Sequence, residues 1–395
     1  MFPRRALRLL LLGVLIVTTS TQPVFLVGAA FFQIGPEFGL GPLGLGFLTA
    51  AFFLASSITS PILGRWVQQV GWRRAMRFNC LASSVLMMST ALFARSVWWL
   101  AGFLIVSAAV YGMSNPAANQ ALALHTDPDR AATVFGLKHA GIPSSTLLAG
   151  LAVPVLVVNY GWRAGFVASS LMAAAVWFLI PKSDQAESAS FRAAPQRGRP
   201  LAPNLIKLLA AAAGLASLAA TALGTYMVSS AVDGGFSEVA AGYLQFAGSA
   251  VSILARVIAG VLVDRRKAPG YVGLFTLMAV GGLAFVGLSS TTGAMFAVVT
   301  ILAYATGWAW PGLMTFTVVD ANRGAAAKSS SIMQAGVFVG AGAGPIVVGA
   351  VVERWGFGVA FLVVAGCLMS AAVLVRVVRA RAYAADPSDQ SESSV

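Results

Sequence analysis

The residues best suited to chemistry are cations placed inside apolar stretches. Arg256 is the only basic residue of 237–263, and Lys138 lies beside His139 in a second apolar stretch. Placing a charge in a hydrocarbon environment is costly, so a basic residue at such a position marks a functional site. No Asp or Glu occupies a comparable depth in any apolar stretch. This pattern predicts an interior that binds an anion.

The spacing around Arg256 predicts one polar face of a helix. Gln245, Ser249, Ser252 and Arg256 follow one another at intervals of four, three and four residues. A guanidinium is a planar fork that can bind a carboxylate through two hydrogen bonds. Two structural roles remain as alternatives for Arg256. It could bond to main-chain carbonyls, or it could pair with Asp264 two turns away.

The second stretch offers a lysine and a histidine on different faces. Lys138 shares a helical face with Gly141 and Ser145, where it could respond to substrate charge or to a proton. The alternative is that Lys138 snorkels to water at the end of its helix. His139 points about 100° away from Lys138. It could carry a coupling proton because histidine titrates near neutral pH, or it could simply pack with a hydrogen bond.

The composition identifies the elements that must hold these residues. The chain is 58% hydrophobic and 10% charged, with a mean hydropathy of +0.82, whereas soluble domains carry about 25% charged residues. We therefore expect an all-α integral membrane protein, because the apolar runs are too long for barrel strands. The net charge of +13 fits positive-inside loops rather than nucleic-acid binding. Two Cys and two His cannot build a zinc cluster, so no metal or other cofactor is expected. The sequence shows no cluster of catalytic residues that would indicate an enzyme.

Twelve transmembrane helices of about the length that a bilayer requires are predicted. They form an N-terminal six-helix bundle at 1–180, a cytoplasmic linker at 181–203, a C-terminal six-helix bundle at 204–383 and a disordered tail at 384–395. The start of the chain imitates a signal peptide but is interpreted as a retained first helix. The predicted spans are Leu7–Phe32, Leu43–Leu63, Met76–Phe93, Val97–Ala118, Ala132–Val158, Trp162–Ile180, Leu205–Ser230, Val239–Val263, Tyr271–Leu288, Ala294–Val318, Ser329–Val352 and Val359–Val378.

The basic residues predict the orientation. If both termini are cytoplasmic and the spans alternate, only Arg95, Arg163 and Arg354 fall on the far side. Lys138 and Arg256 lie within spans, and every other Lys and Arg is cytoplasmic. One miscounted helix would scramble this bias, so it also supports the number of spans. We expect a monomeric multi-pass protein of a bacterial inner membrane.

The two halves repeat one another in parallel. Matching residues recur at an almost constant offset of 195 or 196, and six helices per half preserve the orientation. The matched pairs include Gly64 with Gly260, Gly112 with Gly307, Ala140-Gly141 with Ala335-Gly336, and Gly161 with Gly356.

Two parallel six-helix repeats resemble the major facilitator superfamily. The family's loop signature follows its second helix, and here Gly64 to Arg74 keeps both glycines and the basic pair but has Gln68 in place of the acid. The second copy keeps the acid, as Asp264. In this loop the acid can sit at a helix N-terminus and pair with arginine, which would latch the cytoplasmic side shut. The alternative for Arg73 and Arg74 is that they only enforce topology. The implied gating residues are Gly64, Arg73, Arg74, Gly260, Asp264 and Arg265.

Within that superfamily, the eighth helix resembles those of monocarboxylate and oxalate/formate carriers. These place an arginine four residues before the loop glycine, as Arg256 stands before Gly260. The resemblance implies that Arg256 binds a substrate carboxylate, and that the first, fourth, seventh and tenth helices line a central cavity. Polar and aromatic stripes, with Gln334 at the repeat position of His139, supply the remaining predicted substrate-binding residues: Gln22, Phe25, Tyr111, Asn115, Asn119, Thr221, Thr225, Tyr226, Tyr304, Trp308 and Gln334.

These features predict a secondary transporter that moves a small organic anion by alternating access between the two halves. Its partners would be an anionic small molecule and the lipid bilayer. Proton coupling remains open because no mid-membrane acid is present. The first alternative is a proton-coupled exporter of amphipathic compounds, which predicts cationic substrates. An alternative of another class is a receptor or scaffold that transports nothing.

Overall fold

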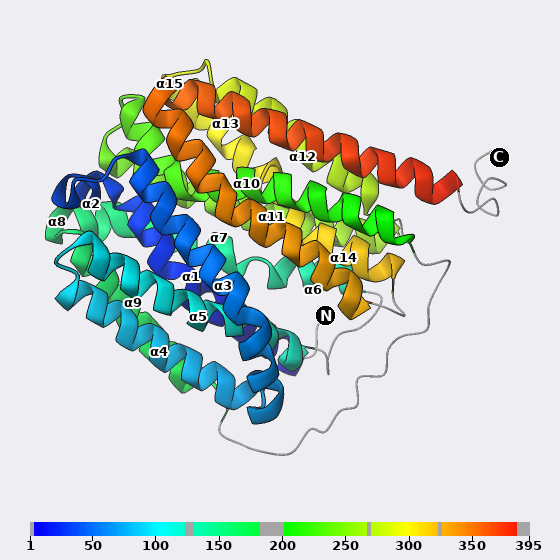
Figure 1. The fold of residues 1–395 in the computed structure, drawn as a ribbon, viewed down its shortest axis with the longest axis horizontal. Coiled ribbons are helices and arrows are strands. Elements are labelled where there is room, and N and C mark those ends of the chain that lie inside the picture. The colour runs from blue at the N-terminus through cyan, green and yellow to red at the C-terminus, as the bar shows by residue number, and fades with distance from the viewer. Residues whose placement is uncertain (1–3, 123–129, 182–200, 267–269, 323–325, 385–395) are drawn as a thin grey trace.

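The computed structural model describes residues 4–122, 130–181, 201–266, 270–322 and 326–384 (Figure 1). Within these residues the secondary structure is helical, with no strand. Most of the predicted linker, 182–200, and of the predicted tail, 385–395, lies outside the described residues.

The helices largely follow the predicted spans. Eleven described stretches are long and apolar enough to cross a membrane. The last stretch contains two spans, because its φ and ψ at Gly356 are 78° and 176° and therefore not helical. The helices are α1 (Arg4–Ala29), α2 (Phe31–Phe38), α3 (Pro42–Val70), α4 (Trp72–Phe93), α5 (Val97–Leu122), α6 (Ala131–Lys138), α7 (Gly141–Ala152), the π-helical turn η2 (Val153–Val157), α8 (Val158–Tyr160), α9 (Trp162–Leu179), α10 (Pro203–Asp233), α11 (Glu238–Arg266), α12 (Tyr271–Leu288), α13 (Gly293–Thr306), α14 (Trp310–Ala321) and α15 (Ala326–Ala384).

Two predicted spans are broken instead of continuous, which the span prediction did not anticipate. The fifth span divides into α6 and α7 at His139 and Ala140, and the tenth divides into α13 and α14 at residues 307–309. Proline explains both breaks. Pro143 has no N–H for the carbonyl of His139, and its ring crowds that carbonyl. Pro311 stands in the first turn of α14, where its fixed φ suits a helix start.

The backbone reproduces the repeat seen in the sequence. Gly161 and Gly356 have φ of 81° and 78° at an offset of 195, and Gly39 and Gly235 have φ of 64° and 89° at an offset of 196. Positive φ is strained for residues with a side chain, so glycine is required at these turns. The two halves therefore turn at equivalent places, as expected for two parallel six-helix bundles.

The two ends of the molecule differ in charge and in packing. We call the end that carries Arg73 and Arg265 the basic end, and the end that carries Glu37 and Glu353 the opposite end. Near the opposite end the halves approach closely. A Cβ on Gly46 would lie 2.4 Å from the carbonyl oxygen of Pro345. In Figure 1, α3 and the first arm of α15 lie together near α2 and separate toward the basic end.

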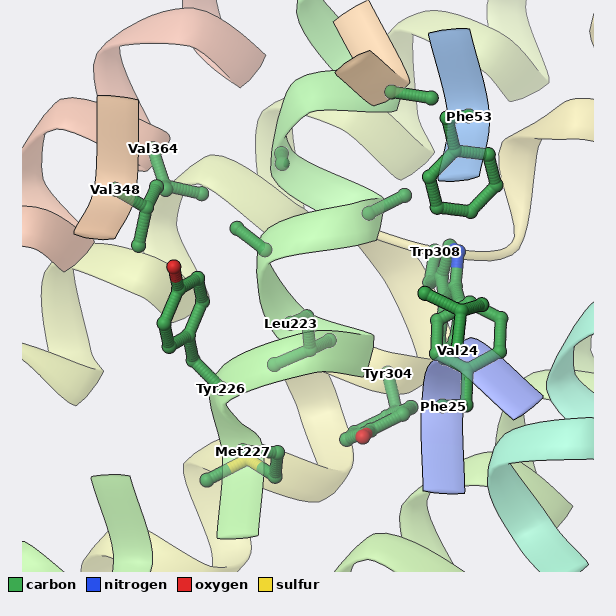
Figure 2. Close-up of a cluster of buried hydrophobic side chains, with 14 of the residues drawn as sticks. Val24, Phe25, Phe53, Leu223, Tyr226, Met227, Tyr304, Trp308, Val348 and Val364 are labelled. Carbon is green, nitrogen blue, oxygen red and sulfur yellow. The ribbon is translucent and has the colours of Figure 1, made fainter. Parts of the chain in front are cut away.

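Aromatic side chains fill the centre between the halves (Figure 2). The rings of Phe25 and Trp308 lie 6.2 Å apart, those of Tyr304 and Trp308 5.4 Å apart, and those of Phe25 and Phe53 6.3 Å apart. A Cβ on Gly224 would lie 2.8 Å from Phe25, so glycine lets α10 reach this cluster. The cluster therefore joins α1 and α3 of the first half to α10 and the α13–α14 turn of the second.

Candidate functional site

Arg256 lies where the two helix breaks meet. Its Nη1 donates to the carbonyl of His139 in the first half, and its Nη2 donates to the carbonyl of Trp308 in the α13–α14 turn, 2.5 Å away. Only 2% of the residue is exposed. Both carbonyls lie at helix breaks and need a donor other than a helical N–H. The main-chain role, one of the two alternatives for Arg256, is thus the one adopted in this structure.

Arg256 keeps donor capacity beyond these two bonds. A guanidinium has five N–H donors, and the buried Nε of Arg256 has no partner among the described residues. The same residue lies over the ring of Trp308, with its Cζ 6.0 Å from the ring centroid. Additional acceptors, such as those of a carboxylate, are therefore chemically compatible with this group.

The alternative pairing of Arg256 with Asp264 is wrong. The Asp264 carboxylate accepts from the main-chain N–H of Ala132 at 3.0 Å and from that of Thr133 at 2.8 Å. It also accepts from the Thr133 hydroxyl at 2.5 Å. The first N–H groups of α6 have no helical partner, and the positive end of the helix dipole favours an anion there. Asp264 therefore caps a helix of the other half, and its charge is not available to Arg256.

Lys138 lies next to the same break. It is 7% exposed, and no hydrogen bond or ion pair joins its ammonium group to any described residue. The ring of His139 is also close to both Lys138 and Arg256, and its Nε2 lies 3.2 Å from the hydroxyl of Thr315 on α14. Three basic residues thus gather at the α6–α7 break, and no carboxylate of a described residue pairs with any of them.

The polar stripe on α11 is buried against α7. Gln245, Ser249 and Ser252 are each 0% exposed. Gln245 donates to the carbonyl of Thr146 at 3.1 Å, and the hydroxyls of Ser249 and Thr146 lie 2.8 Å apart. Among the described residues, Gln245 Oε1 and Ser252 Oγ have no partner. Buried polar atoms normally have one, so this stripe also keeps unused binding capacity.

The remaining predicted binding residues divide into those near this centre and those away from it. Phe25, Tyr304 and Trp308 form the aromatic cluster, and Gln22 accepts from Ser145 at 3.1 Å. Tyr111 stacks on Phe52. Of the others, Asn115 and Gln334 are partly buried and Asn119 is exposed. Thr221 donates to the carbonyl of Ser217, and the hydroxyl of buried Thr225 has no partner among the described residues. The hydroxyl of Tyr226 lies 2.8 Å from the carbonyls of Pro42 and Pro345, near the opposite end.

The predicted gating residues lie at the basic end, in two unequal groups. Asp264 bonds to α6, and a Cβ added to Gly260 would meet the backbone of α6, whereas a Cβ added to Gly64 would meet only Pro116 of its own half. Arg73 lies over the ring of Trp72, 4.5 Å from its centroid. Arg74 follows it on α4, and Arg265 is exposed at the end of α11.

Three threonines matter that the sequence analysis did not select. Thr133 bonds to Asp264, Thr146 to Ser249, and Thr315 to His139. Threonine is common in helices of membrane proteins, so its presence alone carries little information. A usable signal was Pro143, four residues after His139, because it predicts a free carbonyl at the position that Arg256 binds.

Comparison with known proteins agrees with the architecture. A profile of the Major Facilitator Superfamily matches residues 10–331 and 209–394. A search of curated proteins gave no significant match. One similar solved structure is a bacterial homologue of the human lysosomal transporter Spinster in an inward-facing, unoccupied conformation. Its TM-score is 0.67 at 16% identity, over 96% of each chain.

Another similar structure is the transporter FucP in its outward conformation. It has a TM-score of 0.65 at 16% identity, over 95% of this chain and 99% of that one. At 16% identity both structures support only the fold. The family profile covers nearly the whole chain and supports membership of the family. The twelve spans, the paired breaks and this match lead to one conclusion: the chain belongs to the major facilitator superfamily and is a multi-pass membrane transporter rather than an enzyme.

Proposed function

We propose that this transporter carries a small organic anion, of the monocarboxylate type, with Lys138 and Arg256 as the counter-charges. The observation that carries the proposal is Lys138: the residue is only 7% exposed, and its ammonium group has no acceptor among the described residues. A buried charge without a partner is strongly unfavourable. An anionic substrate beside the α6–α7 break would compensate it.

Binding of an anion to Arg256 would weaken the contact between the two halves. In this structure its two bonds tie α11 of the second half to His139 of the first half and to Trp308. A carboxylate is a stronger acceptor for a guanidinium than a neutral carbonyl. A bound carboxylate therefore competes for the same N–H groups and weakens the link between the halves. Substrate binding would thereby favour the rocking of one half against the other that alternating access requires.

The aromatic cluster and the α11 stripe would contact the rest of the substrate. Phe25, Tyr304 and Trp308 offer apolar surface, while Gln245 Oε1 and Ser252 Oγ offer unused hydrogen-bonding capacity. The basic end would face the cytoplasm of a bacterial cell, because loops rich in Lys and Arg are retained on that side. His139 is the residue available to carry a coupling proton.

Uptake by purified protein in liposomes tests the proposal. Radiolabelled carboxylates would be screened with and without a pH gradient, and the best substrate would then be measured with Lys138→Gln and Arg256→Gln. We expect each substitution to reduce substrate affinity roughly tenfold or more, since each removes a charge-assisted bond in a buried site. Lys207→Gln is the matched control, because Lys207 is exposed at the start of α10.

Two results would overturn the anion proposal. Normal affinity and pH dependence in Lys138→Gln would remove the observation on which it rests. Thermal stabilisation of the protein by lipophilic cations alone, without any stabilisation by carboxylates, would favour the exporter instead. Uptake that is independent of the pH gradient, in wild type and in His139→Gln alike, would exclude proton coupling while leaving the anion proposal intact.

A further inference from the structure

A second basic site lies on the outside of the second half, at the basic end. A surface hollow of about 260 Å³ opens between the start of α12 and the end of α15. Its lining residues are Tyr271, Val272, Phe275, Arg376 and Arg379. It shares no residue with the proposed substrate site around Arg256 and Lys138.

The two arginines face the hollow as a pair. Arg376 and Arg379 are three residues apart on α15, so they lie on the same helical face. Both are exposed, and neither forms an ion pair with a carboxylate of a described residue. Asp320 is an acid near Tyr271 of the lining, but the two guanidinium groups are the charges that line the hollow itself. Two adjacent guanidinium groups favour an anion with several oxygens, such as a phosphate.

Both arginines lie over aromatic side chains. The Cζ of Arg376 lies 5.9 Å from the ring centroid of Phe275, and the Cζ of Arg379 lies 5.7 Å from that of Tyr383. Such contacts stabilise a guanidinium above a ring and restrict its motion. The N–H groups therefore remain near the mouth of the hollow, and less conformational entropy is lost when they bind an anion.

The hollow sits at the level where a membrane ends. Tyr271 begins the span Tyr271–Leu288, and the last span ends at Tyr383. Val272 lines the hollow beside the arginines and is 51% exposed, so an apolar side chain is accessible there. Tyrosine is enriched at the interface between lipid and water. The hollow thus combines two cationic side chains, Arg376 and Arg379, with apolar Val272 and Phe275, as an amphipathic ligand requires.

We propose that this hollow binds the phosphate headgroup of an anionic phospholipid, such as phosphatidylglycerol, in the leaflet at the basic end. The guanidinium groups of Arg376 and Arg379 hold the phosphate, and Val272 and Phe275 contact the first part of an acyl chain. The bound lipid then joins α12 to α15. Basic pockets between transmembrane helices are a general way of binding such headgroups.

Lipid binding to the purified full chain tests this proposal. Short-chain phosphatidylglycerol and phosphatidylcholine would be titrated in detergent, with bound lipid counted by native mass spectrometry and unfolding followed by temperature. We expect the glycerol headgroup lipid to bind and to raise the unfolding temperature. Arg376→Gln or Arg379→Gln should each weaken binding roughly fivefold, the equivalent of about 1 kcal/mol for one arginine near a lipid surface.

Arg381→Gln is the matched control, because Arg381 is exposed on the same helix end and does not line the hollow. We expect less than a roughly twofold change there. Arg376→Lys retains charge but not the fork, so an intermediate loss supports the proposal even where Arg376→Gln unfolds. Equal losses in all three glutamine variants would overturn it, as would equal binding of phosphatidylcholine. Stabilisation by inorganic phosphate equal to that by the lipid would instead assign the site to a soluble anion.

Discussion

Two equivalent helix crossings lie at the basic end, α11 with α6 and α3 with α15. Only the crossing of α11 with α6 is held by a carboxylate. In the second half, a Cβ on Gly260 would lie 2.7 Å from the carbonyl oxygen of Ala132, so α11 packs directly on α6. In the first half, a Cβ on Gly64 would meet only Pro116, at 3.5 Å. Asp264 makes three hydrogen bonds across the halves, whereas Gln68 is exposed at the end of α3.

This difference shows that a duplicated sequence need not produce a duplicated interaction. Both halves keep the glycine, and both keep helices at equivalent places. The first copy has Gln68 where the second has Asp264, and a neutral amide gains much less from a helix N-terminus than a carboxylate. We therefore expect the α11–α6 crossing to hold the basic end together while α3 and α15 are free to separate there.

The largest expected effect comes from adding one methyl group to each glycine. Gly260→Ala places a carbon against the backbone of α6, which cannot yield without separating the helices, and should destabilise the protein by about 2–3 kcal/mol. Gly64→Ala should change stability by less than about 0.5 kcal/mol, because 3.5 Å is an ordinary contact. Thermal unfolding in one detergent compares them. Equal losses would show that the two crossings are equally tight.

Removing the charge of the latch should have the next largest effect. Asp264→Asn keeps one acceptor oxygen but loses the charge and a second acceptor, so stability should fall by about 1–2 kcal/mol. Gln68→Asn serves as the control and should leave stability unchanged. Hydrogen exchange of the Ala132 and Thr133 amides would report the change locally. Unaltered protection of these amides would argue against capping by Asp264.

Adding the missing acid should make the first crossing more like the second. Gln68→Asp supplies a carboxylate that can cap the start of α15, which favours contact of α3 with α15 at the basic end by about 1 kcal/mol. Spin labels at Gln69 and Lys328, both exposed, would report a larger population of short distances. Gln68→Glu adds the same charge on a side chain that is one methylene longer than that of Asp, so it tests whether the length of the side chain matters. An unchanged distance distribution would show that the missing acid does not cause the difference between the two crossings.

The smallest effect concerns the opposite end. Arg163 hydrogen-bonds to Glu37, as does Trp162, and these bonds lower the pKa of Glu37 below its usual value of 4.5 although burial opposes them. A carboxyl with a lowered pKa stabilises the folded state above its unfolded pKa, and this contribution is lost as the pH falls through the folded pKa. The pair is more than a third exposed, so solvent screening limits it to about 0.5 kcal/mol.

Glu37→Gln should therefore lower the unfolding temperature slightly at pH 7, and this difference should disappear as the pH falls through the lowered pKa of Glu37. Asp233→Asn is the matched change at the repeat position in the second half, and no hydrogen bond or ion pair joins Asp233 to a described residue. We expect no effect of that change at either pH. A larger loss in Asp233→Asn than in Glu37→Gln would reverse this comparison.

The sequence by itself determined the number of spans, the parallel repeat and the superfamily. Each depends on a property that is local or periodic along the chain: apolar length, the alternation of basic loops, and residues that recur at a fixed offset. The positive φ at Gly161 and Gly356 was encoded in the same way, since only glycine enters that region without strain. The α11 stripe was also predictable, because helical spacing places its residues on one face.

The tertiary structure alone decided what those residues touch. Helical spacing put Asp264 two turns from Arg256 and made an ion pair plausible, but the nearest N–H groups belonged to α6 of the other half. The partners of Arg256 came from breaks 52 and 117 residues away in the chain. Hydrogen bonds are decided by which groups meet within about 3 Å, and the packing of separate helices sets those meetings rather than any periodicity within one helix.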